Sequence, residues 1–274
     1  MGQASRDSDA GGVEGIRAVM DKFDAFLDAI SKYPRVQGAL APHSIYGVPE
    51  KNWGEVIEYA GSRKLPIHIH LSEVQSEMDE TFKKYGKTPA KFFDELGLWK
   101  QRVVAAHCCC VTSEDIEILG RNKVGIAHNP ESNLKLGTKI APIVELRKAG
   151  ANVAFGTDSV SSNNNLDLLE EADMGAKIQA FRVGAGALKA RDVVAMLTCE
   201  GARAIGMGKD IGSLEVGKRA DVIAVNIDNL HSVPLFDPYS QLAYSSLGSD
   251  VRRVVVEGEV LMKDRVLKKL DERA

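Results

Sequence analysis

The hydrophobic pattern of this chain alternates between the period of a strand and the period of a helix. In 65–71, the apolar residues Leu65, Ile67, Ile69 and Leu71 occupy every second position, which predicts a β-strand. Apolar runs of strand length recur at 36–41, 102–107, 123–128 and 152–156. Helical spacing predicts helices over 13–30, 52–61, 76–85, 89–96, 142–149, 167–182 and 189–207. This alternation predicts parallel strands joined by helical crossovers.

A polar side chain follows or ends each of the five strand-like runs, at its carboxyl end. These side chains are His43, His70, His107, His128 and Asp158. Polar groups gathered at one end of parallel strands are typical of a (β/α)8 barrel, whose active site lies on that face. An open doubly wound sheet is the competing architecture, but no Gly-rich phosphate loop follows a first strand. We therefore predict an α/β fold of the TIM-like barrel type.

Three segments of different character divide the chain. Residues 1–12 are small and polar, which predicts a disordered tail. Residues 13–208 carry the strand and helix alternation, and they are fewer than the roughly 250 residues of a complete barrel, so we predict part of a barrel. Residues 209–274 contain short strand patterns at 212–226, 251–256 and 259–262 with Gly and Asp turns, which predict a small β-sandwich portion.

The composition excludes several classes of partner. The 274 residues contain 35 Lys and Arg against 38 Asp and Glu without a basic patch, so we expect no nucleic-acid partner. No apolar run approaches the roughly 18 residues of a membrane helix, and the N-terminus lacks a signal-peptide core. Three of the four cysteines are consecutive, Cys108 to Cys110, and adjacent cysteines do not make a disulfide framework. We expect a cytoplasmic protein without membrane contact.

The strand at 65–71 also carries candidate chemistry. His68 and His70 share one face of it, and Glu73 follows just past its end. Taken alone, this arrangement fits core-edge histidines held by backbone hydrogen bonds as well as it fits a metal site. Together, His70, His107 and Asp158 form a set of nitrogen and oxygen donors suited to a divalent metal such as zinc. Glu73 would then move protons for an attacking water.

Six stretches of the sequence, in order, resemble one known family. They are APHSIYG, HIHLSEVQSE, AAHCCCVTSEDIEIL, GIAHNPESNLKLGTKIAPI, VAFGTDSVSSNNNLDLLEE and GSLEVGKRADVIAV. In this combination the chain resembles the amidohydrolase superfamily, and within it the methylthioadenosine/S-adenosylhomocysteine deaminases and related aminohydrolases. The resemblance runs from about Gly38 to the C-terminus.

The resemblance implies roles for five residues. His70 resembles the metal ligand on the fifth barrel strand, and Asp158 resembles the ligand on the eighth, where it also acts as base for the water and contacts substrate. Glu73 resembles the proton-shuttling glutamate that contacts the purine ring. His107 matches the histidine that orients the attacking water, and His43 matches a substrate-contacting histidine near the ribose.

The resemblance leaves three other polar residues with lesser roles. His68 matches no family ligand, so we expect it to be structural, as we do for His128. Ser162 is expected to line the purine pocket.

The family pattern also includes parts that this chain does not match. Family members begin with a small β segment and a first barrel strand whose His-x-His supplies two metal ligands, whereas the present matches correspond to strands four to eight. With two ligands missing, zinc or another divalent metal is expected to bind weakly or to be absent. Open parallel edges predict association into a homo-oligomer, unless the chain is part of a longer parent enzyme.

The resemblance implies a zinc-dependent hydrolytic deaminase of a small adenosine-type nucleoside such as methylthioadenosine, S-adenosylhomocysteine or deoxyadenosine, with release of ammonia. Glu73 favours deamination over triazine dechlorination, because an amine leaving group needs a proton donor. Guanine deaminase, cytosine deaminase and triazine hydrolase remain alternatives. A further alternative, from another class, is a catalytically dead, truncated homologue that serves as an assembly or binding module.

Overall fold

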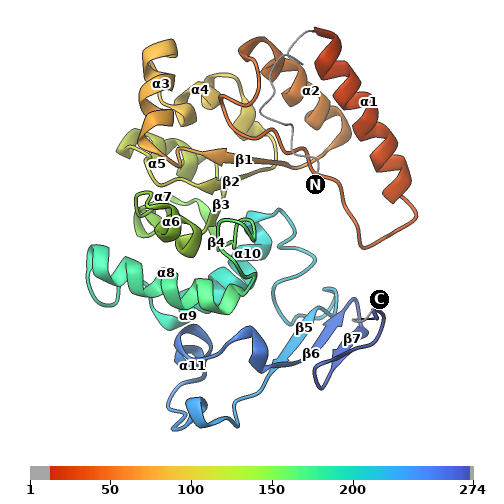
Figure 1. Cartoon of the computed structure of the whole chain (residues 1–274), viewed down its shortest axis with the longest axis vertical. Coiled ribbons are helices and arrows are strands. Elements are labelled where there is room, and N and C mark those ends of the chain that lie inside the picture. Colours follow the sequence, from red (N-terminus) through yellow and green to blue (C-terminus); the bar gives the residue numbers. More distant parts are fainter. Residues whose placement is uncertain (1–12, 272–274) are drawn as a thin grey trace.

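A parallel sheet with helices packed around it forms the main body of the structure, which is a computed structural model describing residues 13–271 (Figure 1). The sheet has four strands in the order β1-β2-β3-β4, and every neighbouring pair is parallel. Their bounds are β1 Ile67–Leu71, β2 Val103–His107, β3 Gly125–His128 and β4 Asn152–Phe155. This is the α/β fold expected of part of a barrel. The predicted tail, residues 1–12, lies outside the described residues.

Helices connect the strands and continue beyond them. Their bounds are α1 Val13–Ile30, α2 Trp53–Arg63, α3 Gln75–Tyr85, α4 Pro89–Glu95, α5 Ser113–Arg121, α6 Pro130–Leu136, α7 Ile143–Ala149, α8 Leu168–Val183, α9 Ala190–Leu197, α10 Cys199–Ala204 and α11 Pro238–Tyr244. Short 3₁₀ helices occupy Glu50–Asn52, Leu98–Lys100, Leu230–Ser232 and Gly248–Asp250.

The predicted alternation of β1 is confirmed. Ile67, Ile69 and Leu71 are fully buried, whereas His68 on the opposite face is exposed. The register pairs Leu71 with His107 across β1 and β2, so that the carboxyl ends of these strands lie level. Apolar burial of one face therefore fixes where the polar strand ends meet.

The predicted strand over 36–41 is wrong, because the structure has only a single bridge in this segment. Only Leu40 forms a bridge there, parallel to Ile67 of β1. Pro42 has no N–H to continue a ladder, and Gly38 is pressed so closely against α1 that an added Cβ would lie 2.5 Å from Leu27 Cδ2. The backbone N–H of His70 nevertheless donates to the His43 carbonyl at 2.9 Å, which keeps this segment beside β1.

Two other predictions about regular structure need correction. No helix is predicted over 130–137, yet this segment contains helix α6, whose first residue is Pro130 and which ends at Gly137 with φ 70°. The single helix expected over 189–207 is two helices, because Thr198 at φ −124° and ψ −99° interrupts it. Helices α5 and α11 lie in segments without a predicted helix.

The C-terminal segment forms a second, antiparallel sheet in the order β5-β6-β7-β8. Its strands are β5 Val222–Val225, β6 Val251–Val256, β7 Glu259–Lys263 and β8 Val266–Leu267. Arg35, in the segment that follows α1, forms ion pairs with Glu257 and Glu259 of this region. The boundary at 208/209 and the sandwich character of this segment stay predictions. Among residues 13–271, no helix has both the length and the apolar character needed to cross a membrane.

Candidate active site

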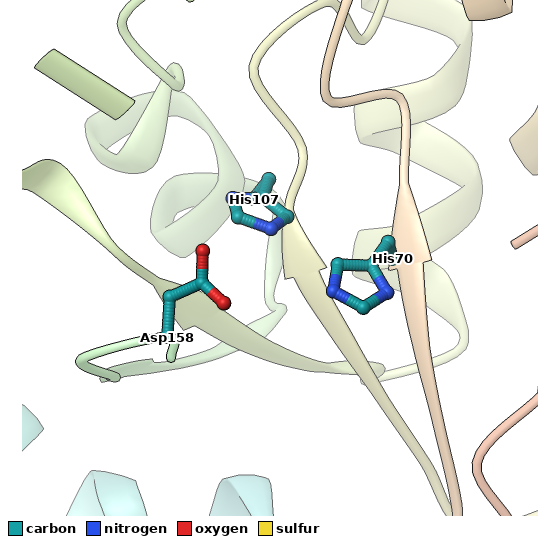
Figure 2. Close-up of side chains that lie close together, drawn as sticks. All are labelled: His70, His107 and Asp158. Atoms are coloured by element: carbon teal, nitrogen blue, oxygen red, sulfur yellow. The ribbon is translucent and has the colours of Figure 1, made fainter. Parts of the chain in front are cut away.

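Three polar side chains converge at the carboxyl end of the parallel sheet. His70 is the fourth residue of β1, His107 ends β2, and Asp158 lies three residues beyond β4. One donor atom of each lies within 4.8 Å of the others, and Figure 2 shows their side chains directed towards a common point. The structure thus brings together the three residues that the sequence indicated as a candidate metal set.

The backbone bends sharply where these side chains leave the strands. His107 has φ 73°, Asp158 has φ 58°, and Ser72 just after β1 has φ 51°. This left-handed region is uncommon for residues other than glycine, and it costs on the order of 1–3 kcal/mol where it is strained. Strain at all three strand exits is typical of a functional site rather than of packing alone.

Asp158 is held as a carboxylate by surrounding donors. Ser132 Oγ donates to its Oδ2 at 2.6 Å, and the Ser159 backbone N–H donates to its Oδ1 at 2.7 Å. Partial burial acts to raise the pKa of Asp158, but hydrogen bonds from Ser132, Ser162 and Ser159 outweigh it and lower that pKa. The residue therefore carries a negative charge at neutral pH and can serve as an oxygen ligand or as a base.

His70 is oriented by the neighbouring backbone. Its Nδ1 lies 2.9 Å from the carbonyl oxygen of His43, and the rings of the two histidines stack with centroids 4.4 Å apart. A carbonyl oxygen only accepts hydrogen bonds, so Nδ1 carries the proton and Nε2 keeps a lone pair. Metal-binding histidines are commonly held by such a bond to a carbonyl, so His70 and Asp158 fit two ligand positions of a zinc ion, one fewer than the three protein ligands usual in catalytic zinc sites.

His107 is fully buried and contacts two amide side chains. Asn133 Nδ2 lies 2.9 Å from its Nδ1, and Asn129 Nδ2 lies 3.5 Å from the same atom. Its Nε2 has no hydrogen-bond partner within the described part of the chain and lies 3.9 Å from Glu73 Oε2. Burial, with a smaller contribution from His70, lowers the pKa of His107 to about 4, so the ring is neutral near pH 7.

Glu73 lies on a turn that a second glutamate supports. The Ser72 and Glu73 backbone N–H groups each donate to the carboxylate of Glu77 at 3.0 Å. Glu77 is 4% exposed, and burial raises its pKa to about 7 although both bonds act to lower it. Burial also raises the pKa of Glu73. A carboxyl group with a raised pKa is suited to exchange protons near neutral pH.

The remaining predicted residues lie around this cluster in different ways. His43 stacks on His70, and Ser162 is nearly buried beside Asp158. His68 is exposed on β1. His128 is buried against Phe155 outside the cluster, where burial lowers its pKa to about 3. The structural roles of His68 and His128 stay predictions.

Sequence reasoning missed four residues that support the site. Asn129 directly precedes α6, and Ser132 and Asn133 lie in α6, where no helix is predicted. Glu77 lies in α3 and supports the turn that carries Glu73. The available signal was the density of amide and hydroxyl residues in 129–133, directly after a strand that ends in histidine. Cys108, Cys109 and Cys110 are buried free thiols after β2, as expected for small apolar residues at a strand end.

Several proteins of known sequence match most of this chain. The 5-methylthioadenosine/S-adenosylhomocysteine deaminase of Desulforamulus reducens is 41% identical over 239 residues, which is 87% of this chain and 55% of that protein. The protein of the same name from Desulfitobacterium hafniense is 44% identical over 237 residues, covering 86% of this chain and 55% of that protein. The chain therefore spans about half the length of these curated relatives.

Solved structures agree with these matches. An adenosine deaminase from Xanthomonas campestris with bound zinc has a TM-score of 0.88 and 34% identity, covering 95% of this chain and 59% of that one. The atrazine chlorohydrolase TrzN from Arthrobacter aurescens TC1, complexed with zinc, has a TM-score of 0.82 and 26% identity, covering 93% and 58%. Residues 8–261 match the profile of the Amidohydrolase family. On this evidence, the chain belongs to the amidohydrolase family.

Proposed function

We propose that this chain takes part in the hydrolytic deamination of an adenosine-type nucleoside at a zinc site formed by His70 and Asp158. The observation that carries the proposal is the convergence of His70, His107 and Asp158, beside Glu73, at the carboxyl ends of parallel strands. The names of the relatives support an adenosine-type substrate such as methylthioadenosine, S-adenosylhomocysteine or deoxyadenosine.

Each residue has a distinct task in this reaction. Water adds its oxygen to the ring carbon that bears the exocyclic amine, and the amine leaves as ammonia after gaining a proton. The Asp158 carboxylate accepts a proton from the water, and Glu73 delivers a proton to the leaving amine. His107 orients the water. When bound, zinc supplies Lewis acidity that lowers the pKa of water at the site.

Glu73 favours amine release over release of chloride. Its carboxyl group is partly buried 3.9 Å from His107, and burial raises its pKa, so it holds a proton closer to neutrality than a solvated glutamate does. An amine leaves only when protonated, whereas chloride leaves as the anion. The nucleoside would lie against His43, whose ring stacks on that of His70.

Zinc binding and ammonia release by the purified chain test the proposal together. We expect the chain to bind one zinc weakly by titration calorimetry, because only two ligands are proposed, and to release ammonia from methylthioadenosine, S-adenosylhomocysteine or deoxyadenosine. H70A is expected to lose zinc binding. The matched control is H68A, a histidine on the same face of β1 that is exposed and lies outside the cluster.

Two results would contradict parts of the proposal. Equal zinc binding by H70A and the unmodified chain would remove His70 as a ligand. Ammonia release from guanine, or chloride release from a chlorotriazine, in preference to the adenosine derivatives would assign the site to another substrate class. The association of this chain into an oligomer through the outer strands of its sheet remains a proposal, which sedimentation of the same sample checks.

A further inference from the structure

The two histidines of the cluster have opposite kinds of partner at Nδ1. The partner of His70 is the backbone carbonyl of His43, which can only accept a hydrogen bond. The partners of His107 are the Nδ2 groups of Asn133 and Asn129, at 2.9 and 3.5 Å, and an amide NH₂ group only donates. Asn133 is 3% exposed and His107 is fully buried, so water does not compete for these bonds.

A neutral imidazole carries one proton, and these partners decide where it lies. In His70 the carbonyl places the proton on Nδ1. In His107 the two amide donors leave Nδ1 as the acceptor, which places the proton on Nε2. Neither amide nitrogen can accept a hydrogen bond, so a proton on Nδ1 of His107 would have no acceptor among these partners.

The charges that face His107 favour the same assignment. Its Nε2 lies 3.9 Å from Glu73 Oε2, and the Asp158 carboxylate belongs to the same cluster. An N–H directed towards carboxylates is attracted to them, whereas a lone pair in that position is repelled. The amides on one side of the ring and the carboxylates on the other therefore act together.

We propose that Asn133, assisted by Asn129, is a positioning residue that holds His107 as the Nε2–H tautomer. His107 then presents a hydrogen-bond donor to the reacting water or substrate oxygen, while His70 presents a lone pair. This rests on the proposed function and deepens it, because it separates the ligand role of His70 and Asp158 from the donor role of His107. If the Asn133 amide were rotated by half a turn, its Oδ1 would face Nδ1 of His107 and accept a proton from it. The lone pair would then lie on Nε2, and His107 could act as a third metal ligand.

Nitrogen NMR of the metal-free chain distinguishes these two arrangements. Long-range ¹H–¹⁵N correlation of a histidine-labelled sample at pH 7 separates protonated from unprotonated ring nitrogens, and single histidine variants assign the signals. We expect a protonated Nε2 in His107 and a protonated Nδ1 in His70. A protonated Nδ1 in His107 overturns the proposal. Because this measurement requires no turnover, its result is independent of whether the chain deaminates any nucleoside.

An Asn133→Asp variant tests the cause of the tautomer. A carboxylate only accepts, so Nδ1 of His107 must carry the proton and Nε2 gains a lone pair. We expect the His107 tautomer to switch and zinc affinity to rise by roughly 10-fold or more, as for other histidines supported by a carboxylate. An unchanged tautomer in this variant overturns the role of Asn133. If the variant does not fold, the spectrum of the unmodified chain still decides the proposal.

The control variant is Asn164→Asp. Asn164 accepts a hydrogen bond from Lys135 of α6, so this substitution adds the same charge close to the same helix but opposite an ammonium group. We expect neither the His107 tautomer nor the zinc affinity to change. A tautomer switch in this variant would mean that added charge alone moves the proton, against a specific role for Asn133.

Discussion

The contact between α5 and α7 leaves no room for a side chain at Gly120. A Cβ at this position would lie 2.3 Å from the carbonyl oxygen of Ala149 and 2.6 Å from its Cβ. The nearest atom belongs to the backbone of α7, so relief requires the two helices to move apart. Overpacking of this kind costs about 1–3 kcal/mol, and the higher helix propensity of alanine returns up to about 1 kcal/mol. We expect G120A to lower the free energy of unfolding by about 1–2 kcal/mol.

Gly54 provides a matched control, because the same substitution meets no obstacle there. This glycine lies in α2, and a Cβ added to it has no atom within 4 Å. Only the propensity and chain-entropy gains remain, so G54A is expected to raise the free energy of unfolding by about 0.5–1 kcal/mol.

Urea unfolding of the three proteins, followed by circular dichroism, measures both changes. The midpoints should move in opposite directions while the m-values stay equal, since neither substitution alters the surface exposed on unfolding appreciably. Thermal midpoints should follow at roughly 2–4 °C per kcal/mol. The reasoning is refuted if G120A is as stable as G54A, because close contact with the α7 backbone would then carry no cost.

Three further changes test the hydrogen bonds and charges. Thr112 caps α5 by accepting from the Asp115 N–H at 3.2 Å, so T112A should cost about 1 kcal/mol in urea unfolding. Burial raises the pKa of Glu171 from 4.5 to about 8, so the folded chain holds this proton more tightly than the unfolded chain. As the pH rises from 4.5 to about 8, the free energy of unfolding should therefore fall by up to about 1.4 kcal/mol per pH unit. E171Q should reduce this slope when unfolding is measured across that pH range. Tyr59 donates to Asp24 of α1 at 2.6 Å, so Y59F should cost roughly 1 kcal/mol by thermal unfolding, and no loss would mean that this bond does not stabilise the docking of α1.

Local pattern sufficed to predict the four strands of the parallel sheet. In β1 the alternation of apolar and polar residues reports burial directly, so its residues and faces are confirmed by the structure. The segment around Leu40 has comparable apolar content, yet it forms only a bridge. Pairing depends on the neighbour available to a strand, and a single sequence does not contain that information.

At the site, too, some residues are visible in the local sequence pattern and others depend on spatial neighbours. His70, His107 and Asp158 were accessible to prediction because each stands at the end of a strand, where parallel topology brings side chains together. Asn133 contacts His107 from α6, and Glu77 supports the turn at Ser72 and Glu73 from α3. The density of amide and hydroxyl residues in 129–133 was a signal for Asn133, but no comparable signal marks Glu77, and the contacts of both residues appear only with the distances.

The short distance between Asp158 and His70 also reports on the curvature of the parallel sheet. Three inter-strand spacings separate β1 from β4, or about 14 Å in a flat sheet at roughly 4.8 Å each. The donor atoms of His70 and Asp158 nevertheless lie within 4.8 Å. The curl of the sheet, the chain returning after β4 and the reach of the two side chains together close that gap. Any ligand that bridges the two residues therefore draws its affinity partly from the curl, and in return holds the sheet in its curled shape.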